Sequence, residues 1–219
     1  MKSDDEIKRD IEDELQWDPD IDAMDIAVLA KDGVVALTGF VSSYAQKFQA
    51  EADAKRVAGV VGVANDIEVR VPALDQRPDP EIARDAVDVL KSKLPFSSHN
   101  IKLTVHDGWI TLEGEVEWNY QRERAEDAVR WIKGVKGVVN SLDVKPKAEP
   151  TPVDIKHKIE EAFRRSAQID AEQIQVEMHE GEVVLKGIVH SWFEREQAER
   201  AAWSAPGVRN VVDQISIRP

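Results

Sequence analysis

The stretch of sequence that decides the fold is repeated three times along the chain. Residues 31–41 read KDGVVALTGFV, residues 106–116 read HDGWITLEGEV, and residues 179–189 read HEGEVVLKGIV. A second set of matching stretches follows at the same offsets: GVVGVAN at 59–65, GVKGVVN at 134–140 and GVRNVVD at 207–213. Matches at a constant offset over this length indicate three tandem copies of one structural module.

Each of the first three stretches predicts a β-hairpin. An acidic residue and a glycine stand between two segments of alternating apolar residues, and glycine supplies the positive φ that a two-residue turn needs. The turn glycines are Gly33, Gly108 and Gly181. Another glycine recurs on the inward side of the second strand, and we expect it to let a helix approach the sheet closely. These inward glycines are Gly39, Gly114 and Gly187.

A helix is predicted on either side of each hairpin. The first helix of a module has an apolar residue at every fourth position, as at Ile7, Ile11 and Leu15. We expect side-chain caps where these helices begin, at Ser3, Asp79, Thr151, Ser43 and Ser191. The second helix should end at a left-handed glycine, which is Gly59, Gly134 or Gly207. A short last strand then follows in each module.

The predicted fold class is α+β, with three tandem αββαβ modules. A right-handed crossover places the last strand parallel to the second, which gives a three-stranded mixed sheet with two helices on one face. Two proline-rich stretches separate the modules and indicate semi-rigid linkers. The predicted boundaries are residues 1–72, 78–146 and 151–219.

This pattern resembles the BON domain, a bacterial family named for osmotically inducible and nodulation proteins. The resemblance rests on the strand, Asp-Gly turn, glycine-containing strand and Gly-Val helix end, which recur in all three modules; module 3 departs from it at Asn210 and Asp213. It implies a bacterial protein of osmotic stress or envelope physiology that binds a phospholipid surface or protein clients. It also implies an alternative, a cytoplasmic protein that binds or senses a small cation such as potassium.

Charge and composition exclude several classes of protein. The chain carries 29 basic and 42 acidic residues, a net charge of −13, and lacks the basic patch that nucleic acid binding requires. No apolar run is long enough to predict a transmembrane helix, and cysteine is absent. The acidic N-terminus does not read as a secretory signal, so the sequence as given predicts a cytoplasmic protein, or a periplasmic one if a signal has been removed.

The sequence favours a protein without catalytic activity, cofactor or bound metal. His106 and His179 share one repeat position with Lys31, which indicates exposed turn residues and not a base or a metal ligand. Histidine spacings do not suit zinc, and no glycine-rich loop opens a helix as a phosphate site would. The acidic run between Asp18 and Asp25 could bind a cation weakly, but it has no calcium-loop spacing and reads better as a solvated loop.

The best candidate for a binding surface is the open face of the module 1 sheet, meaning the face away from the helices. Such a face should be polar, but its expected residues in module 1 are largely apolar. The candidates are Ala27, Leu29, Val34, Ala36 and Phe40. The polar open faces of the other modules have exceptions of their own, Trp109 in module 2 and Val184 and Ile188 in module 3. An exposed apolar patch usually marks a contact, which could be a neighbouring module, a second copy of the chain or a client.

Two further tryptophans break the repeat. Trp131 and Trp203 align with charged or small polar residues in the other modules, so we expect them to face solvent and to serve as interface anchors.

Overall fold

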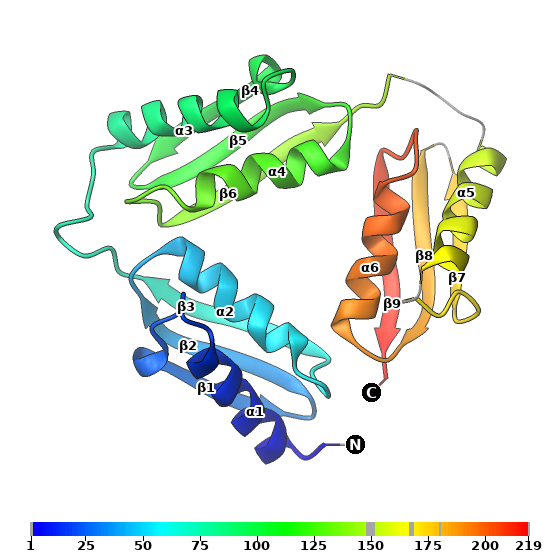
Figure 1. Cartoon of the computed structure of the whole chain (residues 1–219), viewed down its shortest axis with the longest axis horizontal. Coiled ribbons are helices and arrows are strands. Elements are labelled where there is room, and N and C mark those ends of the chain that lie inside the picture. The colour runs from blue at the N-terminus through cyan, green and yellow to red at the C-terminus, as the bar shows by residue number, and fades with distance from the viewer. Residues whose placement is uncertain (1, 148–151, 167–168, 180, 219) are drawn as a thin grey trace.

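Three modules of one topology are arranged around a common centre (Figure 1), in a computed structural model that describes residues 2–147, 152–166, 169–179 and 181–218. Module 1 comprises α1 (Asp4–Trp17), the 3-10 helix η1 (Ala23–Asp25), β1 (Ile26–Lys31), β2 (Val34–Val41), α2 (Tyr44–Arg56) and β3 (Gly62–Val69). Module 2 comprises α3 (Asp79–Lys93), η2 (Ser98–Asn100), β4 (Ile101–His106), β5 (Trp109–Val116), α4 (Asn119–Arg130) and β6 (Gly137–Val144). Module 3 comprises α5 (Pro152–Arg165), β7 (Ile174–His179), β8 (Glu182–Val189), α6 (Trp192–Trp203) and β9 (Asn210–Ile217).

Each module contains a three-stranded mixed sheet, which confirms the predicted α+β class. The strand order is β1-β2-β3 in module 1 and equivalent in the other two. The hairpin strands are antiparallel, and the last strand is parallel to the second. Both helices of a module cover one face of its sheet (Figure 1), so the opposite face is open.

The core of each module forms between the helices and the inward side chains of the strands. The predicted stripe of the first helix is buried in all three modules, as Ile7, Ile11 and Leu15 show in module 1. Val35 and Leu37 of β2 are fully buried beneath them. Because strand side chains alternate between faces, Ala36, which lies between Val35 and Leu37, is on the open face of the sheet.

The contact that requires glycine at the inward positions differs from the predicted one. A Cβ atom at Gly39 would overlap the backbone carbonyl oxygen of Asp25, the residue just before β1, and Gly114 meets Asn100 in the same way. Gly39 has φ +115° and Gly114 φ +127°, values that side chains with a Cβ rarely adopt. The prediction that one of the two packed α-helices lies against them is therefore wrong. The nearest backbone belongs to the residue before the first strand, which ends η1 or η2 in modules 1 and 2, and Gly187 repeats the arrangement with Gln173.

The helix ends agree with the sequence in part. Ser3 forms the predicted capping box with Glu6, and the Ser43 and Ser191 side chains accept hydrogen bonds from the backbone three residues ahead. The second helices end three or four residues before their expected glycines, which lie in the turn that follows. These turn glycines, Gly59, Gly134 and Gly207, all have positive φ. The expected cap Thr151 lies outside the described residues.

The expected cap Asp79 has another role. Helix α3 begins at Asp79 itself, and Pro78 precedes it without a side-chain cap. The Asp79 carboxylate accepts hydrogen bonds from the N–H groups of Asp107 and Gly108 in the hairpin turn, both at 2.9 Å. Asp4 holds the module 1 turn in the same way. The first helix is thereby tied to the tip of the hairpin.

Candidate binding surfaces

The open face of module 1 is apolar over most of its area. Strand pairing aligns Leu29 with Ala36 and Ala36 with Ala64, and in the next row it aligns Val34 with Gly62. Leu29 is 67% exposed and Val34 is 51% exposed. We call this surface the apolar patch; it consists of Ala27, Leu29, Val34, Ala36, Gly62 and Ala64. Nothing in the described chain covers it.

Phe40 lies at the end of β2 and is partly covered by its own module. The Arg70 guanidinium stacks on the Phe40 ring at 4.1 Å from its centroid and forms an ion pair with Glu68. A small cavity of about 160 Å³ lies beside the ring and is lined in part by Asp22 and Asp25. Of the residues expected in the patch, Phe40 is therefore the least available to a partner.

The open faces of modules 2 and 3 differ from that of module 1. Trp109 is half-exposed, but its ring lies flat over Gly137 of β6. Lys186 pairs with Glu177 across β7 and β8 at 2.7 Å, and Asn210 donates a hydrogen bond to Glu182 at 2.8 Å. The open faces of modules 2 and 3 therefore mix polar with apolar residues, such as Thr104 with Val139 and Glu177 with Val184, whereas the row Leu29–Ala36–Ala64 of module 1 is apolar throughout.

Two residues of the patch, Gly62 and Ala64, were missed in the sequence. Both lie on β3, whose inward residues include Val63 and Ile67. The period of two along β3 could have placed them outward, but their position beside β2 depends on the register of a strand brought in by a crossover. The sequence does not determine that register, and the structure shows it.

The three modules meet through their second helices, α2, α4 and α6, which face the common centre (Figure 1). Each pairwise contact includes a cation over an aromatic ring. Arg130 of α4 stacks on Phe48 of α2 at 3.3 Å, Arg122 of α4 on Trp203 of α6 at 4.8 Å, and Lys55 of α2 on Trp192 of α6 at 5.1 Å from the ring centroid. Such pairs join the helices into one ring of contacts.

The two tryptophans expected at interfaces have different environments. Trp203 is only 7% exposed, because it packs at the contact between modules 2 and 3. Its expected solvent exposure is wrong, although it does lie at an interface within the chain. Trp131 follows the end of α4 and is 61% exposed.

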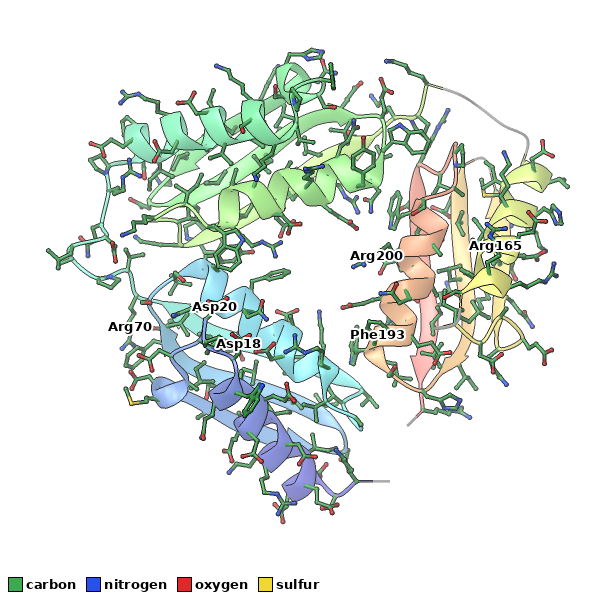
Figure 2. The ribbon with its side chains drawn as sticks, viewed as in Figure 1. Asp18, Asp20, Arg70, Arg165, Phe193 and Arg200 are labelled. Atoms are coloured by element: carbon green, nitrogen blue, oxygen red, sulfur yellow. The ribbon has the colours of Figure 1, made fainter. Side chains whose placement is uncertain are left out.

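A polar cavity of about 350 Å³ lies where the three helices meet. Figure 2 shows Arg200 projecting from α6 toward this centre. The cavity is lined by Phe48, Glu123, Glu126, Asp127, Arg130, Glu196, Glu199, Arg200 and Trp203. Burial raises the pKa of Glu199, and a hydrogen bond from the Trp203 indole opposes that change. Arg130 pairs with Glu126 and Asp127, and the same Arg130 stacks on Phe48 of module 1, so we assign the cavity to the packing between modules.

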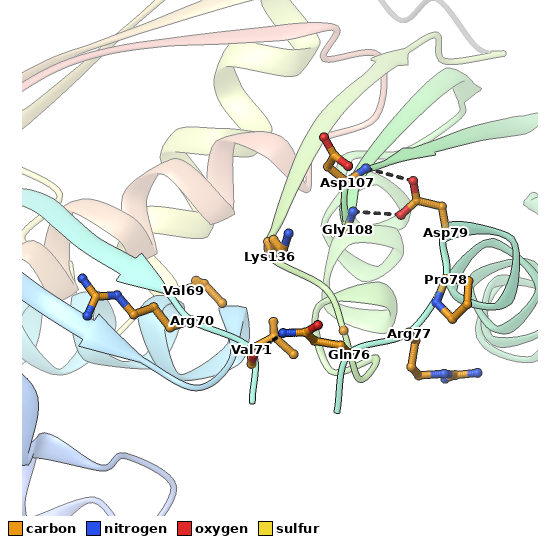
Figure 3. Close-up of a pocket in the computed structure, with 11 residues that line it drawn as sticks. Val69, Arg70, Val71, Gln76, Arg77, Pro78, Asp79, Asp107, Gly108 and Lys136 are labelled. Carbon is orange, nitrogen blue, oxygen red and sulfur yellow. Dashed lines mark hydrogen bonds between the residues drawn. The ribbon is translucent and has the colours of Figure 1, made fainter. Parts of the chain in front are cut away.

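Another cavity, of about 600 Å³, lies at the linker between modules 1 and 2 (Figure 3). Its lining includes Arg70, Arg77 and the Asp79 carboxylate bound to the hairpin turn. Arg77 pairs with Glu81 and Asp85, and these carboxylates raise its pKa further. Asp79 thus holds the hairpin turn, and Arg77 joins the linker to α3.

Module 1 also buries an acidic side chain. Asp53 of α2 is inaccessible to solvent and stands where modules 2 and 3 have Ala128 and Ala201. Its Oδ1 contacts Arg56 at 2.6 Å, while its Oδ2 is buried without a hydrogen bond partner. Burial, opposed by Arg56 and reinforced by Asp18, raises the pKa of Asp53 to about 6. Figure 2 labels Asp18, which accepts a hydrogen bond from Gln49 of α2.

Within the described ranges, no three His, Asp or Glu side chains come together in a way that could hold a metal ion. Asp18, Asp22 and Asp25, from the acidic run considered above as a cation site, are among the residues searched and form no such group. A search of the same residues finds no helix long and apolar enough to cross a membrane.

The repeat, the αββαβ topology and the glycine positions together define a class of small α+β modules, and comparison with known sequences identifies the family. The profile of the BON domain matches residues 3–71, 78–146 and 153–219. The chain therefore belongs to the BON domain family, with three tandem domains. It is 33% identical over 129 residues to osmotically-inducible protein Y of Escherichia coli (strain K12), a match covering 57% of this chain and 64% of that protein.

A comparison of whole structures adds nothing to this assignment. The C-terminal domain of CdsD, a structural protein of the type III secretion system of Chlamydia trachomatis, aligns over 100% of both chains with 14% identity and a TM-score of 0.28. A second CdsD structure gives a TM-score of 0.29 with 15% identity, over 98% of this chain and 93% of that one. Scores this low support no conclusion about arrangement or function.

Proposed function

We propose that this protein is a non-enzymatic binding protein of the osmotic stress response, and that it contacts protein clients through the apolar patch of module 1. The observation that carries the proposal is the exposure of Leu29 and Val34 on the open face of module 1, where the row Leu29–Ala36–Ala64 has no polar side chain, whereas the equivalent rows of modules 2 and 3 contain Thr104 and Glu177. The similarity to osmotically-inducible protein Y supports the physiological setting.

Charge favours a protein client over a phospholipid surface. Residues 1–72 carry 16 acidic and 8 basic side chains, so module 1 has a net charge of −8. Anionic headgroups would be repelled by this surface. An unfolded polypeptide exposes apolar side chains that the patch can cover. Burial of apolar surface is favourable whatever the net charge of the polypeptide.

The test uses reduced, carboxymethylated lysozyme as an unfolded client and compares it with vesicles of phosphatidylcholine and of phosphatidylglycerol. Leu29→Glu should weaken binding of the unfolded client at least about tenfold, because a buried leucine contact contributes roughly 1.5–3 kcal/mol. Thr104→Glu changes the equivalent residue of module 2 and is the matched control, which should bind as the wild type does.

The phospholipid alternative makes the opposite prediction. Co-sedimentation with either vesicle, together with no binding of the unfolded client, would replace the protein client by a lipid surface. Equal binding of the client by the wild type and Leu29→Glu would remove the apolar patch from the proposal.

A further inference from the structure

Strand β1 is an edge strand with an unused hydrogen-bonding side. In the strand order β1-β2-β3 it has one neighbour, and within the described residues its backbone forms ladder hydrogen bonds to β2 alone. The two-residue turn closes on the pair Lys31–Val34. Because an antiparallel ladder alternates, the N–H and C=O groups of Val28 and Ala30 point away from β2. These groups can accept another strand.

A groove runs along the same edge, on the helix side of the sheet. It has a volume of about 610 Å³ and lies between α1, the loop that follows it and β1. Its lining combines the apolar residues Leu15, Ile21, Met24, Ile26 and Val28 with the polar residues Glu12, Gln16 and Asp22. The apolar patch, with Ala27 and Leu29, lies on the other side of the same strand. The side chains of an added strand alternate between the two faces of the sheet. Every second side chain would therefore lie in the groove, and the others would lie beside the apolar patch.

The corresponding edges of modules 2 and 3 carry residues that discourage such pairing. The outward residues of β4 include Lys102 and Thr104, and those of β7 include Gln175 and Glu177. Charged side chains on an edge strand are a common protection against pairing with another chain. The outward positions of β1 are Ala27 and Leu29, with Lys31 at its end. Module 1 therefore presents the least protected edge.

From these observations we infer that β1 accepts an extended segment of a client protein as a fourth strand, and that this segment is apolar at alternate positions and rich in lysine or arginine. The inference rests on the proposed function and specifies its mode, a strand addition. The positive charge follows from the surroundings. Glu12 and Asp22 line the groove beside β1, and residues 1–72 as a whole carry a net charge of −8. A second copy of the chain, itself at −13, fits this surface poorly.

The experiment uses a blocked nine-residue peptide in which lysine and valine alternate. Titrated into the full chain, it should bind at one site and slow the amide hydrogen exchange of Val28 and Ala30 at least about tenfold. The amide of Leu29, already in the ladder to β2, should change little. Binding should weaken as salt is raised, because the contact is charge-assisted.

Three controls separate the parts of this inference. Two further peptides carry N-methyl groups on alternate amides, one on the odd-numbered and one on the even-numbered residues. The peptide whose methylated amides face β1 should not bind, and the other should bind as before. A peptide with glutamate in place of lysine should bind at least about tenfold more weakly. Leu29→Lys should weaken binding of the lysine peptide by a similar factor, whereas the matched change Thr104→Lys in module 2 should leave it unchanged.

The failure of this inference differs from the failure of the proposed function. If the peptide binds and depends on Leu29, but neither N-methylation nor exchange at Val28 and Ala30 shows an effect, strand addition is wrong while client binding at the patch stands. If no peptide binds, the inference is wrong whatever the unfolded lysozyme does. Protection confined to β4 or β7 would also overturn it.

Discussion

Gly114 shows at the scale of one residue how closely the chain folds back on itself. Replacing Gly114 with alanine should destabilise module 2 by at least about 2 kcal/mol, because the new Cβ would overlap the Asn100 carbonyl and the backbone has φ +127°. Thermal unfolding followed by circular dichroism measures this.

Gly62 provides the matched control. Its φ is not in the positive range, and a Cβ there would lie 3.8 Å from the Val34 side chain, at ordinary contact distance. Gly62→Ala should therefore change the stability by no more than about 0.5 kcal/mol. Equal effects of the two substitutions would contradict the close approach described for Gly114.

Asp53 gives a prediction about pH. Its pKa of about 6 lies above the ordinary value of 3.8, so the folded state binds the proton more tightly than the unfolded state. The ionised carboxylate thus costs stability above about pH 6, and the cost disappears as the pH falls toward 4. It amounts to about 3 kcal/mol, and the opposing effect of Arg56 is already contained in the pKa of about 6.

Asp53→Asn should raise the melting temperature at pH 7 and flatten its dependence on pH between about 4 and 6. The melting curve of the wild type and the variant across this range is the measurement. A variant that is less stable at pH 7, with the pH dependence unchanged, would show that the Arg56 pair outweighs burial.

The sequence holds a signal for Asp53 that the helix pattern does not reveal. An acidic residue stands where the other two modules have alanine, and these alanines, Ala128 and Ala201, are partly buried against the core. For Trp203 the same comparison is misleading, because its counterparts Lys55 and Arg130 are polar residues that also take part in contacts between modules. Comparison among repeats identifies positions that differ, but it does not distinguish solvent from a neighbouring module.

At the scale of elements, the carboxylate of Asp79 joins the start of α3 to the tip of its hairpin (Figure 3). Asp79→Ala should cost module 2 about 1.5–3 kcal/mol, because two N–H groups lose a charged acceptor. Chemical denaturation measures the loss. Asp88→Ala, on the same helix, is the control and should remain within about 0.5 kcal/mol, and a comparable loss in both would contradict the proposed link.

The secondary structure could be predicted from the sequence because each element carries its own period. Helices show an apolar residue at every fourth position, strands alternate, and the Asp-Gly turns fix the hairpin register. The link from Asp79 to the turn could not be predicted, since it joins residues 28 and 29 positions apart. For the same reason, the position of Ala64 beside Ala36 escaped prediction.

At the scale of the whole molecule, Trp203 tests the arrangement of the modules. Trp203→Ala removes the side chain that packs between modules 2 and 3 and the stacking partner of Arg122. We expect a loss of about 3–5 kcal/mol and a larger radius of gyration by small-angle X-ray scattering, as module 3 separates from module 2. Trp131→Ala, an exposed residue of similar size, should change neither quantity.

The arrangement itself could not be predicted from the repeat. We considered a neighbouring module as one of the possible covers for the apolar patch, and the structure places the contacts on the second helices instead. The aromatic and cationic residues of these helices, such as Phe48 and Arg130, pair with residues of another module. Because the helices form the contacts within the chain, Leu29 and Val34 on the open face of module 1 stay exposed.

The most direct test of the binding account maps where an unfolded client contacts the chain. Hydrogen exchange of the full protein, followed by mass spectrometry with and without reduced, carboxymethylated lysozyme, resolves the three modules in one experiment. The account predicts slower exchange in residues 26–41, which contain β1 and β2, and no change in the equivalent residues 101–116. Slower exchange in both segments alike, or in 101–116 alone, would contradict the assignment of client binding to module 1.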